Sequence, residues 1–406
     1  MPQCHICSNT ITPFMTFGQM PIANGFLSEK NTATEYFFEL EVAHCPKCNA
    51  VQLPHQPEKE KMFHTEYPFF SGTSKSMQTH FADFADSVNT EYLAKLHDPF
   101  VIEIGCNDGI LIKNFLNLGY RHLGIDPSAN VADVARSKGV DVITSFFDIT
   151  EAARIIKSHG QADLFLAANV MCHLSNINSV VEGIQRLLKP TGILVFEEPY
   201  LGEVIETTAY DQLYDEHVFL FSAHSVKFLF EQFEMELIDI APQPTHGGSM
   251  RYTVAHKGQH SVTQTVTQQL QKETLLGLCE PSTYKKFKES CEKSRDQLVS
   301  LLESIAKRGE TVAGYAATSK STTVLNYCGI GSSLVSYICD TTPIKHSRLS
   351  PGMHIPVRPD HEFHDDYPDY ALLFAYNHKN EIFQKEKAFS KQGGRWILYV
   401  PEVITL

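Results

Sequence analysis

A series of short apolar runs, each followed by a polar turn and a helix-favouring stretch, fills residues 99–256. The first, PFVIEIGCNDGILIKNFLNLG, is typical of a strand, a glycine turn and a helix. Strands that alternate with helices predict a doubly wound α/β sheet. Ligands of such sheets collect at the carboxyl ends of the strands. Asp126, Asp148, Asn169 and Glu197 each follow a run, so we expect them along that edge.

A second series of strand-like runs, TVAGYAAT, LVSYICDTT, YALLFAY and RWILYVPE, predicts another α/β unit near the end of the chain. Polar, helix-forming residues 258–308, with a break near Pro281, separate the two series. The turn sequences of the two units differ, so we infer no internal repeat. A chain of 406 residues has room for two or three domains. We predict three, at residues 1–62, 63–257 and 258–406, the last with a leading helical linker.

Two Cys-x-x-Cys pairs, Cys4 with Cys7 and Cys45 with Cys48, lie in residues 1–62. Each pair can close a tight turn on one metal ion, and two pairs complete the tetrahedral thiolate shell of Zn²⁺. Four protein ligands leave no open coordination position, so we expect this zinc to be structural. Four unrelated thiols or a redox pair are the alternatives. The long segment between the pairs predicts a small subdomain.

Charge and hydropathy narrow the classes of partner. The formal net charge of −13 argues against nucleic acid, because no basic stripe is available to neutralise phosphates. No apolar run reaches the ~18 residues of a membrane span, and the first residues lack an apolar signal core. We therefore expect a cytoplasmic protein without a membrane partner. No oligomerisation stripe stands out, which favours a monomer.

The turn EIGCNDG follows the first strand of the central unit and differs from the dinucleotide fingerprint G-x-G-x-x-G. Its glycines permit a tight turn and a close ligand, although ordinary turn glycines would look the same. An acid at the end of the next strand is placed to accept hydrogen bonds from ribose hydroxyls. The missing third glycine favours S-adenosylmethionine, which carries no phosphate. The expected cofactor-binding residues are Glu103, Gly105, Asn107, Gly109, Asp126, Pro127, Asp148 and Asn169.

The sequences EIGCNDG and LGIDPS resemble the first two motifs of class I S-adenosylmethionine-dependent methyltransferases. Six flanking sequences resemble, in order, those of three-domain C-methyltransferases that act on nucleotide-linked 4-keto-deoxysugars: GQMPIANGFL, YPFFSGTSKSMQTHF, YDEHVFLFS, HGGSMR, GYAATSKSTTVLNYCGI and GGRWILYVPE. The resemblance covers essentially the whole chain. It implies a zinc-binding domain, a Rossmann-like methyltransferase domain and a second Rossmann-like domain that binds the sugar nucleotide. One departure is Leu220, where relatives usually carry a tyrosine.

The segment YDEHVFLFS contains the main catalytic candidates. C-methylation beside a ketone requires removal of a proton to give an enolate, and a base with a pKa near the working pH suits that task. A histidine, with an ordinary pKa of ~6.5, fits, and the resemblance assigns the role of base to His217. Glu216 would orient the imidazole or bind a sugar hydroxyl, and Tyr214 would bond to the keto oxygen. The alternative is the start of a helix with an incidental histidine.

Two further catalytic candidates lie elsewhere in the chain. His173 follows a buried strand, where methyltransferases of this class meet their substrate; a helix-start histidine is the alternative. Tyr67 precedes the cofactor turn and would fold over the site, as a matching tyrosine does in the family; a core tyrosine is the alternative.

Substrate-binding candidates come from two glycine- or serine-rich turns. In GYAATSKSTT, Ser319 and Ser321 are predicted N-caps, and the free amides of a helix N-terminus bind anions. Lys320 adds a positive charge for a diphosphate, although a solvated lysine on a capped helix fits the same pattern. The glycine loop HGGSMR contributes Ser249 and Arg251.

The sequence therefore predicts an S-adenosylmethionine-dependent C-methyltransferase of a nucleoside-diphosphate 4-keto-6-deoxysugar. Methylation of nitrogen or oxygen in a similar sugar or small metabolite is one alternative. A zinc-containing interaction protein without enzymatic activity is another.

Overall fold

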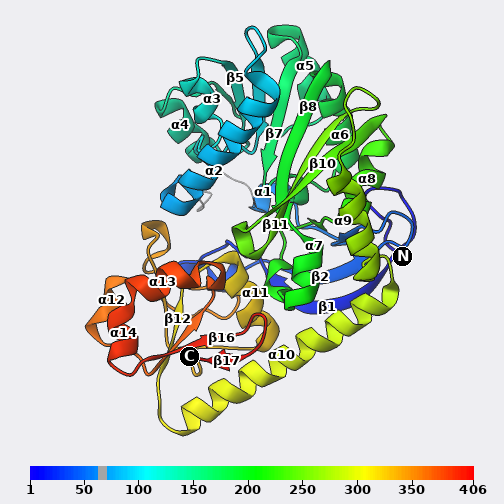
Figure 1. Ribbon diagram of the computed structural model, residues 1–406. Helices are drawn as coiled ribbons and strands as arrows, with labels where there is room; N and C mark the ends of the chain where they lie inside the picture. The colour runs from blue at the N-terminus through cyan, green and yellow to red at the C-terminus, as the bar shows by residue number, and fades with distance from the viewer. Residues whose placement is uncertain (63–70) are drawn as a thin grey trace.

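The computed structural model describes residues 1–62 and 71–406, so Tyr67 lies outside the described residues. The chain forms three sheets of four, seven and six strands (Figure 1). The seven-stranded sheet stands at the top of the view, and the other two lie side by side below it. This arrangement confirms the predicted α/β fold with a small N-terminal part and two α/β units. Within the described residues, no helix is long and apolar enough to cross a membrane.

The central sheet has the strand order β10-β11-β8-β7-β4-β5-β6. Its strands are β4 (Phe100–Ile104), β5 (Arg121–Ile125), β6 (Val142–Ile143), β7 (Ala162–Ala168), β8 (Leu188–Pro199), β10 (Met235–Gln243) and β11 (Ser249–His256). The five strands β4, β5, β6, β7 and β8 run parallel to one another. At the β8 edge, β11 pairs antiparallel with β8, and β10 pairs antiparallel with β11. β4 is buried along its whole length, as expected for a strand with helices on both faces.

Helices cover both faces of the central sheet (Figure 1). They are α2 (Lys75–Val88), α3 (Lys113–Asn117), α4 (Ala129–Ser137), α5 (Ile149–His159), α6 (Ile177–Leu187) and α8 (Ala223–Glu231), whereas α7 (Leu201–Thr207) lies below the sheet, beside the N-terminal sheet. Phe84 of α2 and Phe115 of α3 fill the core on one face, and Ile155 of α5 and Val181 of α6 fill it on the other. The carboxyl ends of the strands stay uncovered by these helices.

The four-stranded sheet joins the N-terminal part to the central part. It consists of β1 (Thr12–Pro21), β2 (Phe37–His44), β3 (Val51–Gln52) and β9 (Phe219–Leu220). β9 belongs to the YDEHVFLFS segment, and it pairs with β3 through Val51 opposite Leu220. The short helix α1 (Lys59–Met62) ends the N-terminal part. This pairing therefore holds the N-terminal part beside the chain that directly follows His217, the predicted base.

The C-terminal part begins with two helices, α9 (Gln264–Leu275) and α10 (Pro281–Lys307), and Pro281 lies at the predicted break. Its strands are β12 (Val312–Tyr315), β13 (Ile338–Asp340), β14 (Val357–Pro359), β15 (Tyr370–Leu373), β16 (Arg395–Leu398) and β17 (Ile404–Thr405). Its remaining helices are α11 (Ser319–Cys328), α12 (His361–Asp365), α13 (Lys379–Lys385) and α14 (Lys387–Lys391).

The long helix α10 runs along the lower edge of the molecule, beside the N-terminal sheet and the C-terminal sheet (Figure 1). Met15 and Val42 of the N-terminal sheet, Leu298 of α10 and Leu372 of β15 belong to one continuous buried cluster. The N-terminal and C-terminal parts therefore share a core, although the central part separates them in sequence.

Glu273 of α9 caps the N-terminus of α8. The first amides of a helix have no partner within it, and here the buried Glu273 carboxylate accepts from Ala223 N at 2.7 Å and His224 N at 3.1 Å. The Ser222 hydroxyl accepts from Ser225 N, so the helix start is satisfied from two directions.

We expect Glu273→Ala to lower stability by about 1–3 kcal/mol, because two buried amides lose their acceptor. Glu273→Gln retains one carbonyl acceptor and should lose less. Urea unfolding followed by circular dichroism measures the change, with the exposed Glu303→Ala of α10 as a control. Equal midpoints for Glu273→Ala and the control would contradict the capping role.

Candidate active site

A cavity of about 520 Å³ lies where the three parts of the chain meet. The N-terminal part contributes Asn24 and Gln56 to its wall, the central part Asp126 and His217, and the C-terminal part Lys320. The cavity contacts the carboxyl ends of β4, β5 and β7, as the topology of a doubly wound sheet predicts. We take this cavity as the candidate active site.

The glycine turn after β4 forms one end of the cavity. Gly105 has φ +61°, and a Cβ atom there would lie 2.1 Å from Val170 Cγ2, so the position accepts only glycine. Gly109 also has a positive φ, but it lies outside the cavity wall, packed toward Ala135. Glu103 lies behind the turn, where burial raises the pKa of its carboxyl well above the ordinary value.

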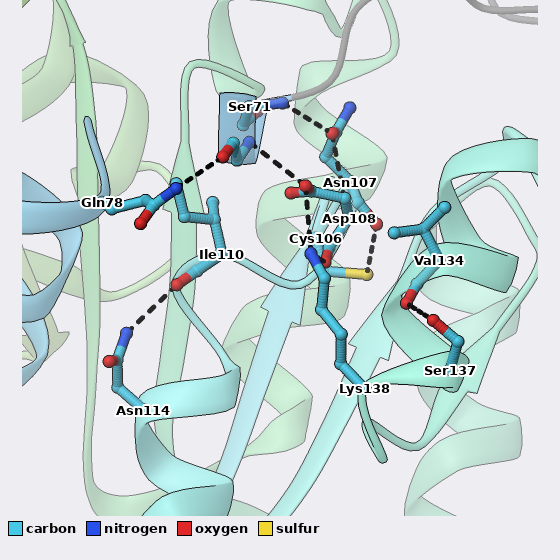
Figure 2. Close-up of polar contacts among 11 residues, drawn as sticks. Ser71, Gln78, Cys106, Asn107, Asp108, Ile110, Asn114, Val134, Ser137 and Lys138 are labelled. Carbon is cyan, nitrogen blue, oxygen red and sulfur yellow. Dashed lines mark hydrogen bonds and ion pairs between the residues drawn. The ribbon is translucent and has the colours of Figure 1, made fainter. Parts of the chain in front are cut away.

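Figure 2 shows how this turn is fixed from outside. Ser71 N donates to Asn107 Oδ1 at 3.1 Å, and Gly72 N donates to Asp108 Oδ2 at 3.2 Å. Lys138, just after α4, donates to the same Asp108 oxygen at 3.1 Å. Side chains of the turn therefore link the residues that precede α2 to the end of α4.

Four more of the predicted cofactor residues line the same end of the cavity: Asp126, Pro127, Asp148 and Asn169. Asp126 accepts from Asn107 N at 2.9 Å and from Ser128 N at 2.8 Å, and burial raises the pKa of its carboxyl to about 6. Asp148 caps α5 by accepting from two amides of its first turn. Asn169 Oδ1 is buried without a hydrogen-bond partner among residues 1–62 and 71–406.

The catalytic candidates of YDEHVFLFS form a turn before β9, not the start of a helix; α8 begins only at Ala223. His217 Nδ1 lies 2.7 Å from the backbone carbonyl oxygen of Gln212, and His217 Nε2 lies 2.6 Å from the Tyr214 hydroxyl. A carbonyl only accepts, so Nδ1 carries the proton and Nε2 accepts from Tyr214. Glu216 accepts from Asn24 Nδ2 at 2.7 Å, which ties the turn to the N-terminal part.

His173 stacks on His217, with ring centroids 5.4 Å apart and an angle of 22° between the planes. Burial lowers the pKa of His173 to about 4. Burial, and then the neighbouring His173, lower the pKa of His217 well below its ordinary value. Burial raises the pKa of Tyr214 well above its ordinary value. At neutral pH both imidazoles are therefore uncharged and the phenol retains its proton.

The opposite end of the cavity is cationic. Lys320 Nζ donates to the backbone carbonyl of His246 at 3.3 Å and lies 4.9 Å from the centre of the Tyr376 ring. Lys345, which the sequence analysis missed, also lines the cavity and donates to the Ala317 carbonyl at 2.7 Å. Burial lowers the pKa of both lysines.

The N-cap of α11 is Thr318, not Ser319 or Ser321 as the sequence suggested. Thr318 and Ser321 form a reciprocal capping box, in which each side chain accepts from the other's backbone amide. Ser319 is the first helical residue and lines the cavity. The prediction failed because three of the four residues 318–321 carry hydroxyls and compete for the same cap.

Ser249 and Arg251 lie on β11 and outside the cavity wall. Arg251 forms an ion pair with Glu197 at 2.9 Å, and its guanidinium lies 3.7 Å from the centre of the Phe84 ring. Ser249 donates to the Thr245 carbonyl at 3.0 Å. Ser249, Arg251 and Glu197 therefore bond to other protein groups and do not line the cavity. His246, from the same glycine loop, does line it.

The four N-terminal cysteines are free thiols that converge on one point. All four sulfur atoms lie within 4.8 Å of one another, and the Cys4–Cys48 and Cys7–Cys45 pairs are 3.5 Å apart. Zinc–sulfur bonds of about 2.3 Å place tetrahedral sulfurs about 3.8 Å apart, so the cluster fits Zn²⁺. The two knuckles match, because Ser8 N and Asn49 N donate to the carbonyls of Cys4 and Cys45.

Comparisons with known proteins follow the same three-part order. Family models match residues 4–63 ("Putative zinc binding domain"), 78–240 ("Methyltransferase domain") and 244–401 ("C-methyltransferase C-terminal domain"). The fold and the site thus define a zinc-containing, S-adenosylmethionine-dependent methyltransferase.

The chain is 31% identical over 403 residues to C-methyltransferase NovU of Streptomyces niveus, which covers 98% of this chain and 96% of that protein. It therefore belongs to the C-methyltransferase family. The ubiquinone biosynthesis O-methyltransferase of Shewanella halifaxensis is 28% identical over 98 residues, 24% of this chain and 42% of that protein. Magnesium protoporphyrin IX methyltransferase from Synechocystis PCC 6803, solved with bound SAM, covers 44% of this chain and 79% of its own, at 12% identity and a TM-score of 0.35.

The residues at the glycine-turn end of the cavity fit S-adenosylmethionine. Gly105 leaves room for a ligand to approach the backbone, because it carries no side chain. The buried Asn169 oxygen offers an acceptor to a donor group of the ligand. Asp126 offers further lone pairs beside its two backbone contacts.

We expect the purified protein to contain one equivalent of zinc, measured by elemental analysis. Cys45→Ser should lose the metal and lower the unfolding midpoint, because zinc binding contributes to folding free energy. Cys279→Ser, which removes a thiol outside the cluster, should retain full zinc. Less than half an equivalent in the wild type, together with unaltered folding of Cys45→Ser, would contradict the structural role.

Proposed function

We propose that the protein transfers a methyl group from S-adenosylmethionine to a carbon beside the ketone of a nucleoside-diphosphate 4-keto-6-deoxysugar. One observation carries this proposal: the His217–Tyr214 pair lies in the same cavity as the glycine turn and the two lysines, Lys320 and Lys345. One cavity thus brings together a candidate site for a methyl donor, a base and cations for an anionic acceptor. Membership of the C-methyltransferase family supports the choice of carbon chemistry.

At the glycine-turn end, Asp126 would accept hydrogen bonds from the ribose hydroxyls, and Asn169 with the Gly105 backbone would hold the amino acid portion. S-adenosylmethionine supplies an electrophilic methyl group. Pro127 and Asp148 would border the nucleoside, while Glu103 and Gly109 would act by shaping the turn.

The base in this proposal is His217. Its Nε2 accepts the proton from the carbon beside the ketone, while the electron pair of that C–H bond moves toward the ketone oxygen. The Gln212 carbonyl holds the proton on Nδ1, so the lone pair that takes the substrate proton lies on Nε2. Because His217 is uncharged at neutral pH, the lone pair is available without prior deprotonation.

Tyr214 would stabilise the enolate. Its hydroxyl bonds to Nε2 in this structure, and it retains its proton because burial raises its pKa. Turned toward the substrate, the same hydroxyl donates to the oxygen on which negative charge develops. His173 stacks against the base and Glu216 lies beside it, so both would contact the sugar ring.

The lysine end of the cavity would bind the diphosphate. Lys320 is half-buried and Lys345 is buried, and a charge taken out of water is unfavourable unless it is paired. A diphosphate between them and the first amides of α11 would supply the opposite charge. Ser319 would add a hydroxyl donor, and Ser249 and Arg251 would support the site from β11.

The decisive experiment incubates the protein with labelled S-adenosylmethionine and a 4-keto sugar nucleotide in deuterated water. We expect methyl transfer together with deuterium wash-in beside the ketone. His217→Asn should bind both ligands normally in calorimetry but lose about 10²–10⁴-fold in kcat and lose the wash-in. Glu216→Gln should cost less, because the amide still accepts a hydrogen bond.

Two outcomes would redirect the proposal. Near-normal kcat in His217→Asn, with abolished turnover in His173→Asn, would make His173 the base. Methyl transfer without any wash-in, unaffected by His217→Asn, would favour a nitrogen or oxygen acceptor.

Asp126→Ala should weaken S-adenosylmethionine binding by roughly 1.5–3 kcal/mol, the scale of hydrogen bonds to a charged group. Titration calorimetry measures it. Asp133→Ala, at an exposed ion pair of α4, is the matched control. Unchanged affinity in Asp126→Ala would place the adenosine elsewhere.

The affinity for S-adenosylmethionine should also depend on pH. The ionised Asp126 carboxylate is the acceptor, and its pKa is raised to about 6, so acid protonates it. Affinity is therefore expected to be constant above neutral pH and to fall as the pH drops below about 6. Calorimetry at several pH values tests this, and Asp126→Asn, which cannot ionise, should lose the dependence. A wild-type affinity that rises toward acid pH would contradict it.

A further inference from the structure

A second cluster of metal-ligating side chains lies at the active-site cavity: His173 and His217 line its wall, and Cys172 is buried behind it. Cys172, His173 and His217 each offer one ligand atom, and these atoms lie within 4.8 Å of one another. Thiolate and imidazole are the ligands that Zn²⁺ and other thiophilic divalent cations prefer. In the part of the chain that the structure describes, only the four-cysteine cluster forms a comparable group.

We propose that a thiophilic divalent cation such as Zn²⁺ binds to Cys172, His173 and His217 and thereby inhibits the enzyme. The inhibitory effect rests on the proposed function, in which His217 is the base. The binding of the cation does not depend on it.

The turn that carries two of the ligands is held rigidly. Cys172 and His173 belong to the 3-10 helix η4 (Met171–His173), which follows β7. The buried Glu198 accepts from Val170 N at 3.0 Å and from Met171 N at 2.7 Å, so one carboxylate oxygen fixes the start of this turn. A rigid turn places both ligands without a large loss of conformational entropy on binding.

The third ligand comes preoriented from the opposite turn. The Gln212 carbonyl accepts from His217 Nδ1, which leaves Nε2 to bind the cation. Histidine ligands in metal sites commonly have their second nitrogen held by such a carbonyl. The Tyr214 hydroxyl, which now donates to Nε2, must turn away when the cation binds.

Binding exchanges a proton for the cation at sulfur. The Cys172 S–H bond breaks, the thiolate bonds to the metal, and the proton passes to the Glu198 carboxylate beside the thiol. Glu198 Oε2 has no hydrogen-bond partner among the described residues, so it can accept that proton. A dication bound to one thiolate retains a single positive charge, and the Glu216 carboxylate lies nearby to offset it.

Three protein ligands distinguish this site from the N-terminal cluster. They leave the fourth position of a tetrahedral cation open to water from the cavity. The cation would occupy the lone pair of His217 Nε2 that removes the substrate proton. We expect kcat to fall while the affinity for S-adenosylmethionine stays the same, because none of the residues proposed to contact the cofactor is a ligand of the cation.

Cobalt titration tests the site directly. Full-length protein with zinc in its four-cysteine cluster is titrated with Co²⁺, and the thiolate-to-cobalt charge-transfer absorption is recorded together with any released zinc. One equivalent of Co²⁺ should give the band without zinc release. Cys172→Ser should lose the band, and Cys279→Ser, a matched thiol outside the cavity, should retain it. A band of equal strength in Cys172→Ser, or one that appears only with zinc release, would overturn the site.

Inhibition is measured with added Zn²⁺ and reversed with a chelator. Cys172→Ser should turn over like the wild type without added metal, and should need at least about tenfold more Zn²⁺ for half inhibition. Cys172→Ala, checked by thermal unfolding, replaces it if the serine variant is unstable. The cobalt band without inhibition by Zn²⁺ would overturn the regulatory effect. If the wild type methylates no 4-keto sugar nucleotide, the proposed function fails, and the cobalt titration still decides the site.

Discussion

The pairing of β3 with β9 is the constraint on which the active site depends. β3 follows directly on the second cysteine knuckle, and β9 follows directly on His217. Leu53 N donates to the Val218 carbonyl at 2.8 Å, and Gln56 donates to the Asp215 carbonyl at 3.2 Å. The cysteine cluster is therefore linked to His217, the predicted base, through a few residues of backbone. A zinc ion there, with no open coordination position, would act by fixing this geometry.

The fold was largely predictable because its strands are buried on both faces and so appear as uninterrupted apolar runs. β4, β5, β7 and β8 coincide with such runs, and Pro281 at the start of α10 gave the helix break. β9 could not be predicted, since two residues in an aromatic segment join a sheet more than 160 positions away in the chain. The boundaries of the three parts stay a prediction, because shared cores and shared sheets cross them.

The parts of the site that sequence reasoning found are those with local signatures, such as the cysteine pairs and the glycine turn. Asn24, Gln212 and Lys345 carry no such signature, and only long-range packing brings them to the cavity. Local reasoning also misplaced one detail, the cap of α11, where Thr318 takes the role given to its neighbours. The glycine loop was a useful signal, but it brings His246 rather than Arg251 to the cavity wall.

The core that Met15, Val42 and Leu298 share with β15 has a consequence for how such enzymes diversify. A new acceptor cannot be obtained by exchanging the C-terminal part as a module, since its apolar contacts reach through α10 into the N-terminal sheet. Recombination within the family must exchange the N-terminal and C-terminal parts together and retain the central part. Changes of acceptor should instead accumulate as point substitutions around the cavity rim, where three distant stretches of sequence evolve against one another.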